Sequence, residues 1–322
     1  METITTRFGT IKAIRVERFT NGSIRSLVAG ARTDLTTSYG TFAPQYQSNE
    51  ERRRMIPEIS LYRNGALRNL PLQDRTFVTT TLGSLPAELI TFYDNGSVKR
   101  IFPMNGKLSG FWTQEDEEQL AEELHIVTSF GPVHAKFISI CFDPLGSLRS
   151  LTLWPGQRIK VPTSVGIFAA RTGISFHSTG EVASLEPARP IRIPTPLGPF
   201  HAFDPDAHGV HGDKNSLCFA PDGQVVALTT VMDQIKITGP NGSTHMICPA
   251  LRESMCNENM LEPVPLRVLF DGEEVIFQTG RGQKACFSLT KNQFFLSPMS
   301  SNNPHLKIPT DSGQIAPCIP SL

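Results

Sequence analysis

Apolar and polar positions alternate along most of the chain, and one phrase recurs within that alternation. An apolar stretch ends at an aromatic residue, a turn ends in glycine, and two apolar positions three residues apart follow. The copies are VERFTNGSIRSL (16–27), ISLYRNGALRNL (59–70), ITFYDNGSVKRI (90–101), ISICFDPLGSLRSL (138–151), ISFHSTGEVASL (174–185) and NSLCFAPDGQVVAL (215–228), with a weaker copy, IKITGPNGSTHMI, at 235–247. Alternation with a period of two is typical of β-strands. The pattern predicts a series of antiparallel β-hairpins.

The turn residues predict how these hairpins close. Pairs such as Asn21-Gly22 and Asp222-Gly223 accept positive φ at both central positions, so we expect type I′ turns. After the turn the apolar spacing lengthens to three, as from Ile24 to Leu27, where strict alternation would give two. This spacing predicts a β-bulge or a corner, or a strand that is covered on both faces.

A second landmark precedes each of the first six copies: a short strand that ends in an apolar residue followed by glycine. These segments are RFG (7–9), SYG (38–40), TLG (81–83), SFG (129–131), SVG (164–166) and PLG (196–198). The unit therefore reads strand, glycine turn, longer strand, glycine turn, strand. Its mean length of about 40 residues is also that of a propeller blade, but a blade needs four strands. We expect an all-β fold of tandem hairpins in an extended or rolled sheet, with a β-propeller as the alternative.

The breaks in the repeat give the expected domain organisation. A capped acidic segment predicts one inserted helix at about 113–125, because Thr113 can cap it and Asp116 follows three residues later. Unit two carries an insertion, and unit six carries a loop insertion at about 201–214. We expect a repeat domain over 1–250, a hairpin cap over 251–296 and a loosely ordered tail over 297–322. The cap would hold two hairpins, LRVLFDGEEVIFQ and KACFSLTKNQFFL.

The repeated phrase resembles the MORN and MORN-like repeat proteins. The residues that carry the resemblance are Phe19-Thr20-Asn21-Gly22, Tyr62-Arg63-Asn64-Gly65 and Tyr93-Asp94-Asn95-Gly96. This resemblance implies stacked antiparallel hairpins and a role as a scaffold or tether, in some members at membranes or lipid headgroups. The unit departs from the usual MORN pattern, because it is longer and adds a preceding strand and a second glycine turn.

Composition and charge limit the function classes. The 322 residues carry 30 Lys+Arg and 30 Asp+Glu, and 39% are hydrophobic, so the composition is globular and no overall charge points to nucleic acid. No apolar run is long enough for a membrane span. The first residues lack the apolar core of a signal peptide, and the six cysteines form no CxxC pair. We therefore expect a cytoplasmic protein with reduced thiols.

The densest group of metal-ligand residues lies in the loop of unit six. His208 and His211 lie among three aspartates, Asp204, Asp206 and Asp213. Imidazole and carboxylate together suit zinc or another first-row metal. The spacing matches no established metal motif, and Asp-Pro and His-Gly pairs also make ordinary turns. A divalent metal site and an inert loop both remain open.

Three consecutive arginines, Arg52, Arg53 and Arg54, lie in the insertion of unit two. They could contact phosphate groups of a lipid or a nucleic acid, or belong to a solvated loop, since Glu50 and Glu51 flank them. We treat them as a candidate binding surface.

These features favour a non-catalytic scaffold or protein-binding module without a cofactor. Its partner would be another protein or a second copy of the chain, because a repeat sheet offers a long face and exposed strand edges. The alternative is a metal-dependent enzyme or metal-binding protein with its site in the 201–218 loop.

Overall fold

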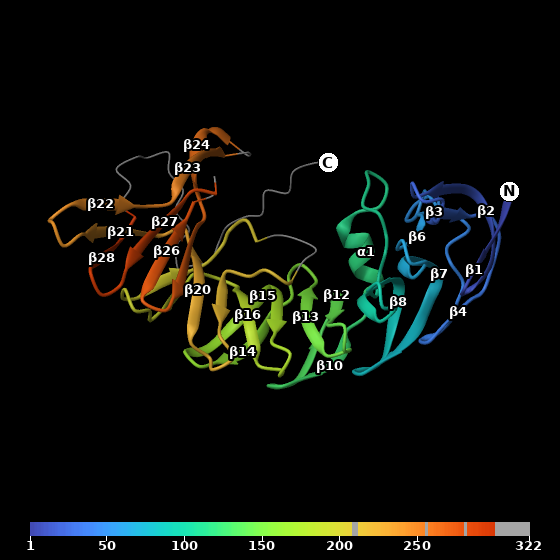
Figure 1. Ribbon diagram of the computed structural model, residues 1–322, viewed down its shortest axis with the longest axis horizontal. Helices are drawn as coiled ribbons and strands as arrows, with labels where there is room; N and C mark the ends of the chain where they lie inside the picture. Colours follow the sequence, from blue (N-terminus) through green and yellow to red (C-terminus); the bar gives the residue numbers. More distant parts are fainter. Residues whose placement is uncertain (208–211, 255–256, 280–281, 300–322) are drawn as a thin grey trace. The chain divides into compact units, whose positions relative to one another are not determined.

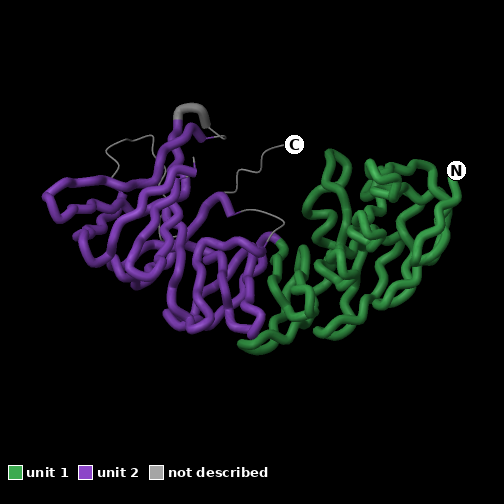
Figure 2. The backbone as a smooth tube through the Cα atoms, in the orientation of Figure 1, with its two compact units in different colours: residues 1–154 green, residues 155–322 purple. Residues whose placement is uncertain are grey.

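The computed structural model describes residues 1–207, 212–254, 257–279 and 282–299 (Figure 1). Antiparallel β-strands joined by hairpins make up nearly all of it, which confirms the predicted fold class. The chain forms two compact units, residues 1–154 and 155–322 (Figure 2). The segment expected to form a separate cap, 251–296, belongs to the second unit.

In the first unit nine strands pair antiparallel, each with the next. They are β1 (Glu2–Thr6), β2 (Gly9–Arg18), β3 (Ile24–Ala29), β6 (Ile59–Leu61), β7 (Leu67–Thr80), β8 (Gly83–Phe92), β9 (Val98–Phe102), β12 (Phe137–Phe142) and β13 (Leu148–Leu153). Two further hairpins pair only within themselves, β4 (Leu35–Thr37) with β5 (Gly40–Phe42) and β10 (Leu124–Thr128) with β11 (Gly131–Ala135).

The second unit repeats this arrangement with eight strands. They are β14 (Ile159–Thr163), β15 (Gly166–Phe176), β16 (Val182–Pro187), β19 (Leu217–Phe219), β20 (Val225–Thr230), β25 (Leu266–Asp271), β26 (Glu274–Gln278) and β27 (Lys284–Ser288). Smaller sheets hold the rest: β17 (Ile191–Ile193) with β18 (Phe200–Ala202), β23 (Ala250–Ser254) with β24 (Asn257–Val264), and β21 (Asp233–Thr238) between β22 (Thr244–Ile247) and β28 (Gln293–Pro298).

This pairing decides between the two expected architectures. Propeller blades are separate four-stranded sheets, whereas each unit here has one continuous ladder from hairpin to hairpin. The propeller alternative is therefore wrong. One predicted hairpin is also wrong: β27 pairs with β26, and β28 pairs with β21 instead of with β27. The other predicted hairpin of that region, β25 with β26, is confirmed.

The recurrent hairpin turn differs from the predicted type I′ turn. In the first copy the amide of Gly22 donates to the carbonyl of Phe19 at 2.9 Å, and the amide of Phe19 donates to the carbonyl of Ser23 at 2.8 Å. Positive φ occurs at Gly22 (82°) and not at Asn21. This is a type I turn followed by one left-handed glycine. Asn21 is suited to it because its Oδ1 accepts the amide of Ser23 at 3.2 Å.

A β-bulge follows this turn in all six copies, which confirms one of the three predicted explanations of the spacing. In the first copy Arg18 pairs with Ile24 and Glu17 pairs with Ser26, so Arg25 is the extra residue. The same shift recurs in the other five hairpins. Because one residue is inserted, Ile24 and Leu27 lie on the same face although they are three positions apart.

The first glycine landmark is part of a four-residue turn, Thr-x-x-Gly, whose threonine the sequence pattern did not reveal. In each turn the threonine hydroxyl donates to the glycine carbonyl at 2.6 to 3.0 Å. The threonines are Thr6, Thr37, Thr80, Thr128, Thr163 and Thr195. Behind each turn lies an apolar cross-strand pair; five of these pairs are fully buried, Ile4/Ile11, Leu35/Phe42, Val78/Leu85, Ile126/Val133 and Ile193/Phe200. The turn and its pair therefore form one structural module per repeat.

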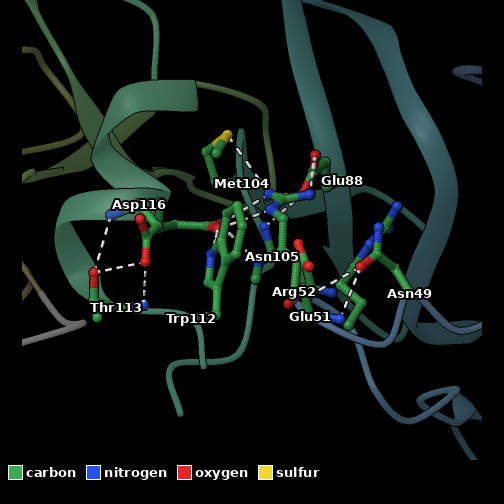
Figure 3. A network of polar contacts seen from close by, with 12 residues as sticks. Asn49, Glu51, Arg52, Glu88, Met104, Asn105, Trp112, Thr113 and Asp116 are labelled. Atoms are coloured by element: carbon green, nitrogen blue, oxygen red, sulfur yellow. Dashed lines mark hydrogen bonds and ion pairs between the residues drawn. The ribbon is translucent and has the colours of Figure 1, made fainter. Parts of the chain in front are cut away.

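The described part of the chain has one helix, α1 (Gln114–Leu120). Thr113 caps it as predicted, in a reciprocal capping box with Asp116, and Figure 3 shows these two side chains facing each other. The helix ends at Leu120, before the predicted end near residue 125, because β10 begins at Leu124.

Candidate functional site: a buried ion-pair cluster between two insertions

Two insertions interrupt the repeats of the first unit. Residues 43–58 connect β5 to β6, and residues 103–123, which include α1, connect β9 to β10. They meet directly, because the amide of Lys107 donates to the carbonyl of Arg52 at 3.0 Å. Within the first insertion Asn49 and Arg53 exchange two backbone hydrogen bonds, of 2.8 and 2.9 Å, which hold Arg52 in a tight loop.

The side chain of Arg52 is buried between two glutamates (Figure 3). Its Nη1 and Nη2 atoms donate to the two carboxylate oxygens of Glu88, on β8, at 3.0 and 2.6 Å. Its Nε and Nη2 atoms donate to the two oxygens of Glu117, on α1, at 2.7 and 2.8 Å. The planar guanidinium suits such paired contacts. We call Arg52, Glu88 and Glu117 the Arg52 cluster.

Glu117 is fully satisfied by hydrogen bonds. Besides Arg52, its oxygens accept the indole N–H of Trp112 at 2.7 Å and the amide of Gly106 at 2.8 Å. A carboxylate offers about four acceptor positions, and all four are occupied. Glu117 is therefore a positioning group, because it has no lone pair free to take a substrate proton.

Three consecutive backbone amides bind the three members of the cluster. The amide of Asn105 donates to Glu88 at 2.7 Å, that of Gly106 donates to Glu117, and that of Lys107 donates to the carbonyl of Arg52. A side chain at position 106 would have its Cβ only 2.1 Å from Glu117 Oε2. Position 106 therefore requires glycine, because any side chain there would collide with the carboxylate of Glu117.

The pKa shifts of Arg52 and Glu117 indicate that both side chains are charged and paired with each other. Burial alone would lower the pKa of Arg52, but the hydrogen bonds and charges of Glu117 and Glu88 outweigh it and raise that pKa. Burial would raise the pKa of Glu117, but the hydrogen bonds from Arg52 and Trp112 bring that pKa below its usual range. All three side chains are nine-tenths or more buried. Removing one partner of such a cluster leaves an uncompensated buried charge.

The two insertions that the cluster joins also carry exposed apolar side chains. Met55, Leu108 and Phe111 are 83%, 59% and 71% exposed. The guanidinium of Arg54 lies 4.2 Å from the centre of the Phe111 ring, so a residue of each insertion takes part in this contact. We call Met55, Leu108, Phe111 and Arg54 the insertion surface.

The three arginines of the predicted binding surface have three different environments. Arg52 is buried in the cluster, and Arg53 is half-buried with its guanidinium donating to the carbonyls of Leu72 and Gln73 at 2.9 and 2.7 Å. Of the three, only Arg54 is exposed. The arginines therefore do not form a single phosphate-binding surface, because protein acceptors hold the first two.

The predicted metal loop is described only in part. His208 and His211 lie outside the described residues. The carboxylate of Asp206 pairs with Arg252 at 2.6 Å. Asp204 is half-buried, and desolvation raises its pKa; Asp213 lies further along the loop. Within the described ranges, no three His, Cys, Asp or Glu side chains are grouped so as to hold a metal ion. The metal site stays a prediction.

One buried carboxylate ties both ends of this loop to the sheet. Glu186, on β16, accepts the amide of Asp204 at 3.3 Å and the amide of Ser216 at 2.8 Å. Burial raises the pKa of Glu186 to about 7, although the nearby charge of Arg171 opposes the shift. Arg171 Nη2 also donates to the carbonyl of Asp204 at 2.6 Å. The loop is thus anchored through Glu186 and Arg171.

Sequence reasoning missed the two glutamates that are buried inside strands, Glu88 and Glu186, although a signal was present. Glu186 follows the leucine of VASLEP, at a position that is uncharged in the other copies: Val28, Pro71, Phe102, Thr152 and Thr229. Glu88 likewise stands inside the apolar stretch LPAELITF. A charged residue inside a strand that is otherwise apolar requires a partner, and here that partner comes from an insertion.

No family model matches this chain, and no curated protein is similar to its sequence at a significant level. None of the helical structure in the described residues is long and apolar enough to cross a membrane. Four cysteines are described, Cys141, Cys218, Cys248 and Cys286, and no disulfide joins any two of them.

Proposed function

We propose that this protein is a non-catalytic repeat scaffold that binds another protein, and that the insertion surface is its docking site. The observation that carries the proposal is the Arg52 cluster, which fixes two insertions to each other and to β8. The resemblance of the hairpin phrase to MORN-like repeats, which serve mostly as scaffolds, supports the same role. We also propose that it acts in the cytoplasm.

The exposed side chains of the insertion surface support this proposal. Three apolar side chains are exposed on the two insertions that the cluster joins, and exposed apolar surface is typical of interaction sites. Phe111 is an aromatic anchor stacked with an arginine, and aromatic residues and arginine dominate the binding energy of many interfaces. A surface that is already ordered loses less conformational entropy on binding than a mobile one. The cluster therefore favours binding by holding the loops in one conformation.

The charges beside the insertion surface favour a particular partner. Glu50 and Glu51 are exposed in the first insertion, and Glu115 is exposed on the first turn of α1. Two basic side chains are exposed there as well: Lys107, next to Leu108, and Arg54, whose guanidinium lies over the Phe111 ring. The three exposed glutamates outnumber them. We therefore expect a partner segment with apolar anchors flanked by lysine or arginine.

Selection from a random library of twelve-residue peptides tests this function. The library is selected on the wild type and, in parallel, on Phe111→Asp and on the control Ile167→Asp, which changes a side chain that is 69% exposed in the other unit. We expect apolar and basic peptides to be enriched on the wild type and the control but not on Phe111→Asp. Equal enrichment on all three proteins, or no enriched peptide, would contradict the proposal.

A further inference from the structure

A row of basic side chains lies at the β-bulges of the first unit. The extra residue of the bulge is basic and exposed in four successive hairpins: Arg25, Arg68, Lys99 and Arg149. The same position holds Ala183 and Val226 in the second unit. A bulge leaves this residue unpaired in the ladder, so its side chain is presented by the backbone in the same way in each repeat. We call the four residues the basic row.

The spacing of the row follows from the strand order. Arg25 lies on β3 and Arg68 on β7, with β6 between them. Lys99 on β9 and then Arg149 on β13 continue the row, again with one strand between successive members. Neighbouring strands are about 4.8 Å apart, so successive cations are about 9.5 Å apart.

The cations of the row are available to an external anion. Among the residues that the structure describes, no ion pair joins any of the four to a carboxylate. Arg149 makes a hydrogen bond with the uncharged side chain of Tyr93. Arg68 and Lys99 lie over the rings of Tyr62 and Tyr93, at 5.9 and 5.4 Å from the ring centres. Such cation–π contacts orient a side chain while leaving its charge exposed.

Carboxylates near the row are few. Asp94 lies in the turn before Lys99 and is exposed. Asp143 lies in the turn before Arg149, and its Oδ1 accepts the amides of Leu145 and Ser147, both at 2.9 Å. Glu17 lies opposite Ser26, beside the Arg25 bulge, and is paired with Arg15 at 3.2 Å. The four cations of the row outnumber these three carboxylates, so the row carries a net positive charge.

We propose that the basic row binds an acidic protein segment in the polyproline II conformation, with a carboxylate at every third residue. A polyproline II helix has three residues per turn and rises about 3.1 Å per residue, so every third side chain lies on one face about 9.3 Å from the last. This period matches the spacing of the cations. Phosphates of a nucleic acid strand are spaced more closely, about 3.4 Å along a duplex axis. This surface is independent of the insertion surface.

Two synthetic peptides test whether the spacing of the cations matches the three-residue period of the carboxylates. One repeats Glu-Pro-Pro five times, and the other has the same composition with its five glutamates contiguous. Dissociation constants are measured by fluorescence anisotropy at about 0.01 and 0.15 M salt. We expect the periodic peptide to bind about tenfold more tightly than the contiguous one. Equal affinities would overturn the proposal, because they would indicate attraction by charge alone.

A matched pair of double variants locates the site. Arg68→Glu/Lys99→Glu reverses two charges of the row, and Lys12→Glu/Arg32→Glu reverses two exposed charges elsewhere in the same unit. The first is expected to weaken periodic-peptide binding about tenfold, and the control less than about twofold. Equal losses in both would contradict the proposal. So would row-dependent binding of phosphatidylserine vesicles without binding of either peptide, because the partner would then be a membrane.

Discussion

Arg52 and Glu117 are 65 residues apart in the sequence, and their side chains form a buried, two-point ion pair of 2.7 and 2.8 Å. Neither residue lies in a strand of the repeat. Their contact makes two separate insertions behave as one element, and Glu88 connects that element to β8. The repeats therefore form the sheet that holds the insertions, and the insertions carry the surface that we propose to be functional.

Replacing Arg52 tests how much the Arg52 cluster contributes to the free energy of unfolding. Arg52→Ala leaves Glu88 and Glu117 buried without a counter-charge, so we expect a loss of about 3–5 kcal/mol in the free energy of unfolding. The neighbouring Arg54→Ala removes an exposed side chain and should change that free energy by about 0.5 kcal/mol or less. Urea unfolding at pH 7 measures both. A similar small effect for the two variants would show that the cluster contributes little.

Gly106 tests the close approach of the backbone to Glu117. Gly106→Ala places a methyl group where Glu117 Oε2 lies 2.1 Å away, and we expect a loss of about 1–3 kcal/mol from overpacking. Gly110→Ala is the matched control, because an added Cβ there has no neighbour within 4 Å. Thermal unfolding of both variants compares them. The expectation fails if the two melting temperatures fall equally.

We expect the threonine hydroxyl of each Thr-x-x-Gly turn to stabilise the folded chain. Thr80 donates to the carbonyl of Gly83 at 2.8 Å and accepts the amide of Leu82 at 3.1 Å. Thr80→Val keeps the shape but removes both bonds, so we expect a loss of about 1–2 kcal/mol. The exposed neighbour Thr79→Val is the control, and urea midpoints compare the two. Equal midpoints would show that these recurrent hydrogen bonds of the turn are not stabilising.

Because the pKa of Glu186 is raised in the folded chain, we expect the free energy of unfolding to depend on pH. Its pKa is raised by burial to about 7 in the folded chain, against 4.5 for an ordinary glutamate. The folded chain therefore binds this proton more tightly, so the stabilisation is full below about pH 4.5 and is lost as the pH rises through 7. The shift corresponds to about 3 kcal/mol.

Urea midpoints between pH 5 and 8 check this dependence. Glu186→Gln cannot ionise, so the fall in stability with rising pH should flatten in this variant, whereas the exposed Glu273→Gln should retain the wild-type slope. An unchanged slope in Glu186→Gln would assign the dependence to other groups, of which the half-buried Asp204, whose pKa is also raised by desolvation, is the nearest.

The sequence predicted those features that depend on residues a few positions apart. Most of the hairpins and the Thr113 cap follow from local pattern and local hydrogen bonds. The lengthened apolar spacing after each turn was predicted to be a bulge, a corner or a strand covered on both faces, and the structure shows the bulge. The turn type was mispredicted because Asn-Gly fits both a type I′ turn and a type I turn that ends in a left-handed glycine. Local pattern alone does not distinguish the two.

The candidate site could not be predicted because it depends on contacts between distant segments. Arg52 meets Glu88 and Glu117 across 36 and 65 residues, and the arginine triplet looks the same in sequence whether it is exposed or buried. The pairing of β28 with β21 is a similar case, since a strand's own pattern does not specify its partner. The buried glutamates gave a signal that a partner exists, but not which residue it is.

Hydrogen–deuterium exchange of the amides of Asn105, Gly106 and Lys107 tests the central claim most directly, because each donates to a different member of the Arg52 cluster. It would be measured in the wild type and in Arg52→Lys, which keeps the charge but loses the planar fork. We expect these three amides to exchange at least about tenfold faster in the variant, and the exchange of the β8 amide of Ile90 to be unchanged. Unchanged exchange at all four positions, or equal acceleration at all four, would contradict the claim that Arg52 holds the two insertions together.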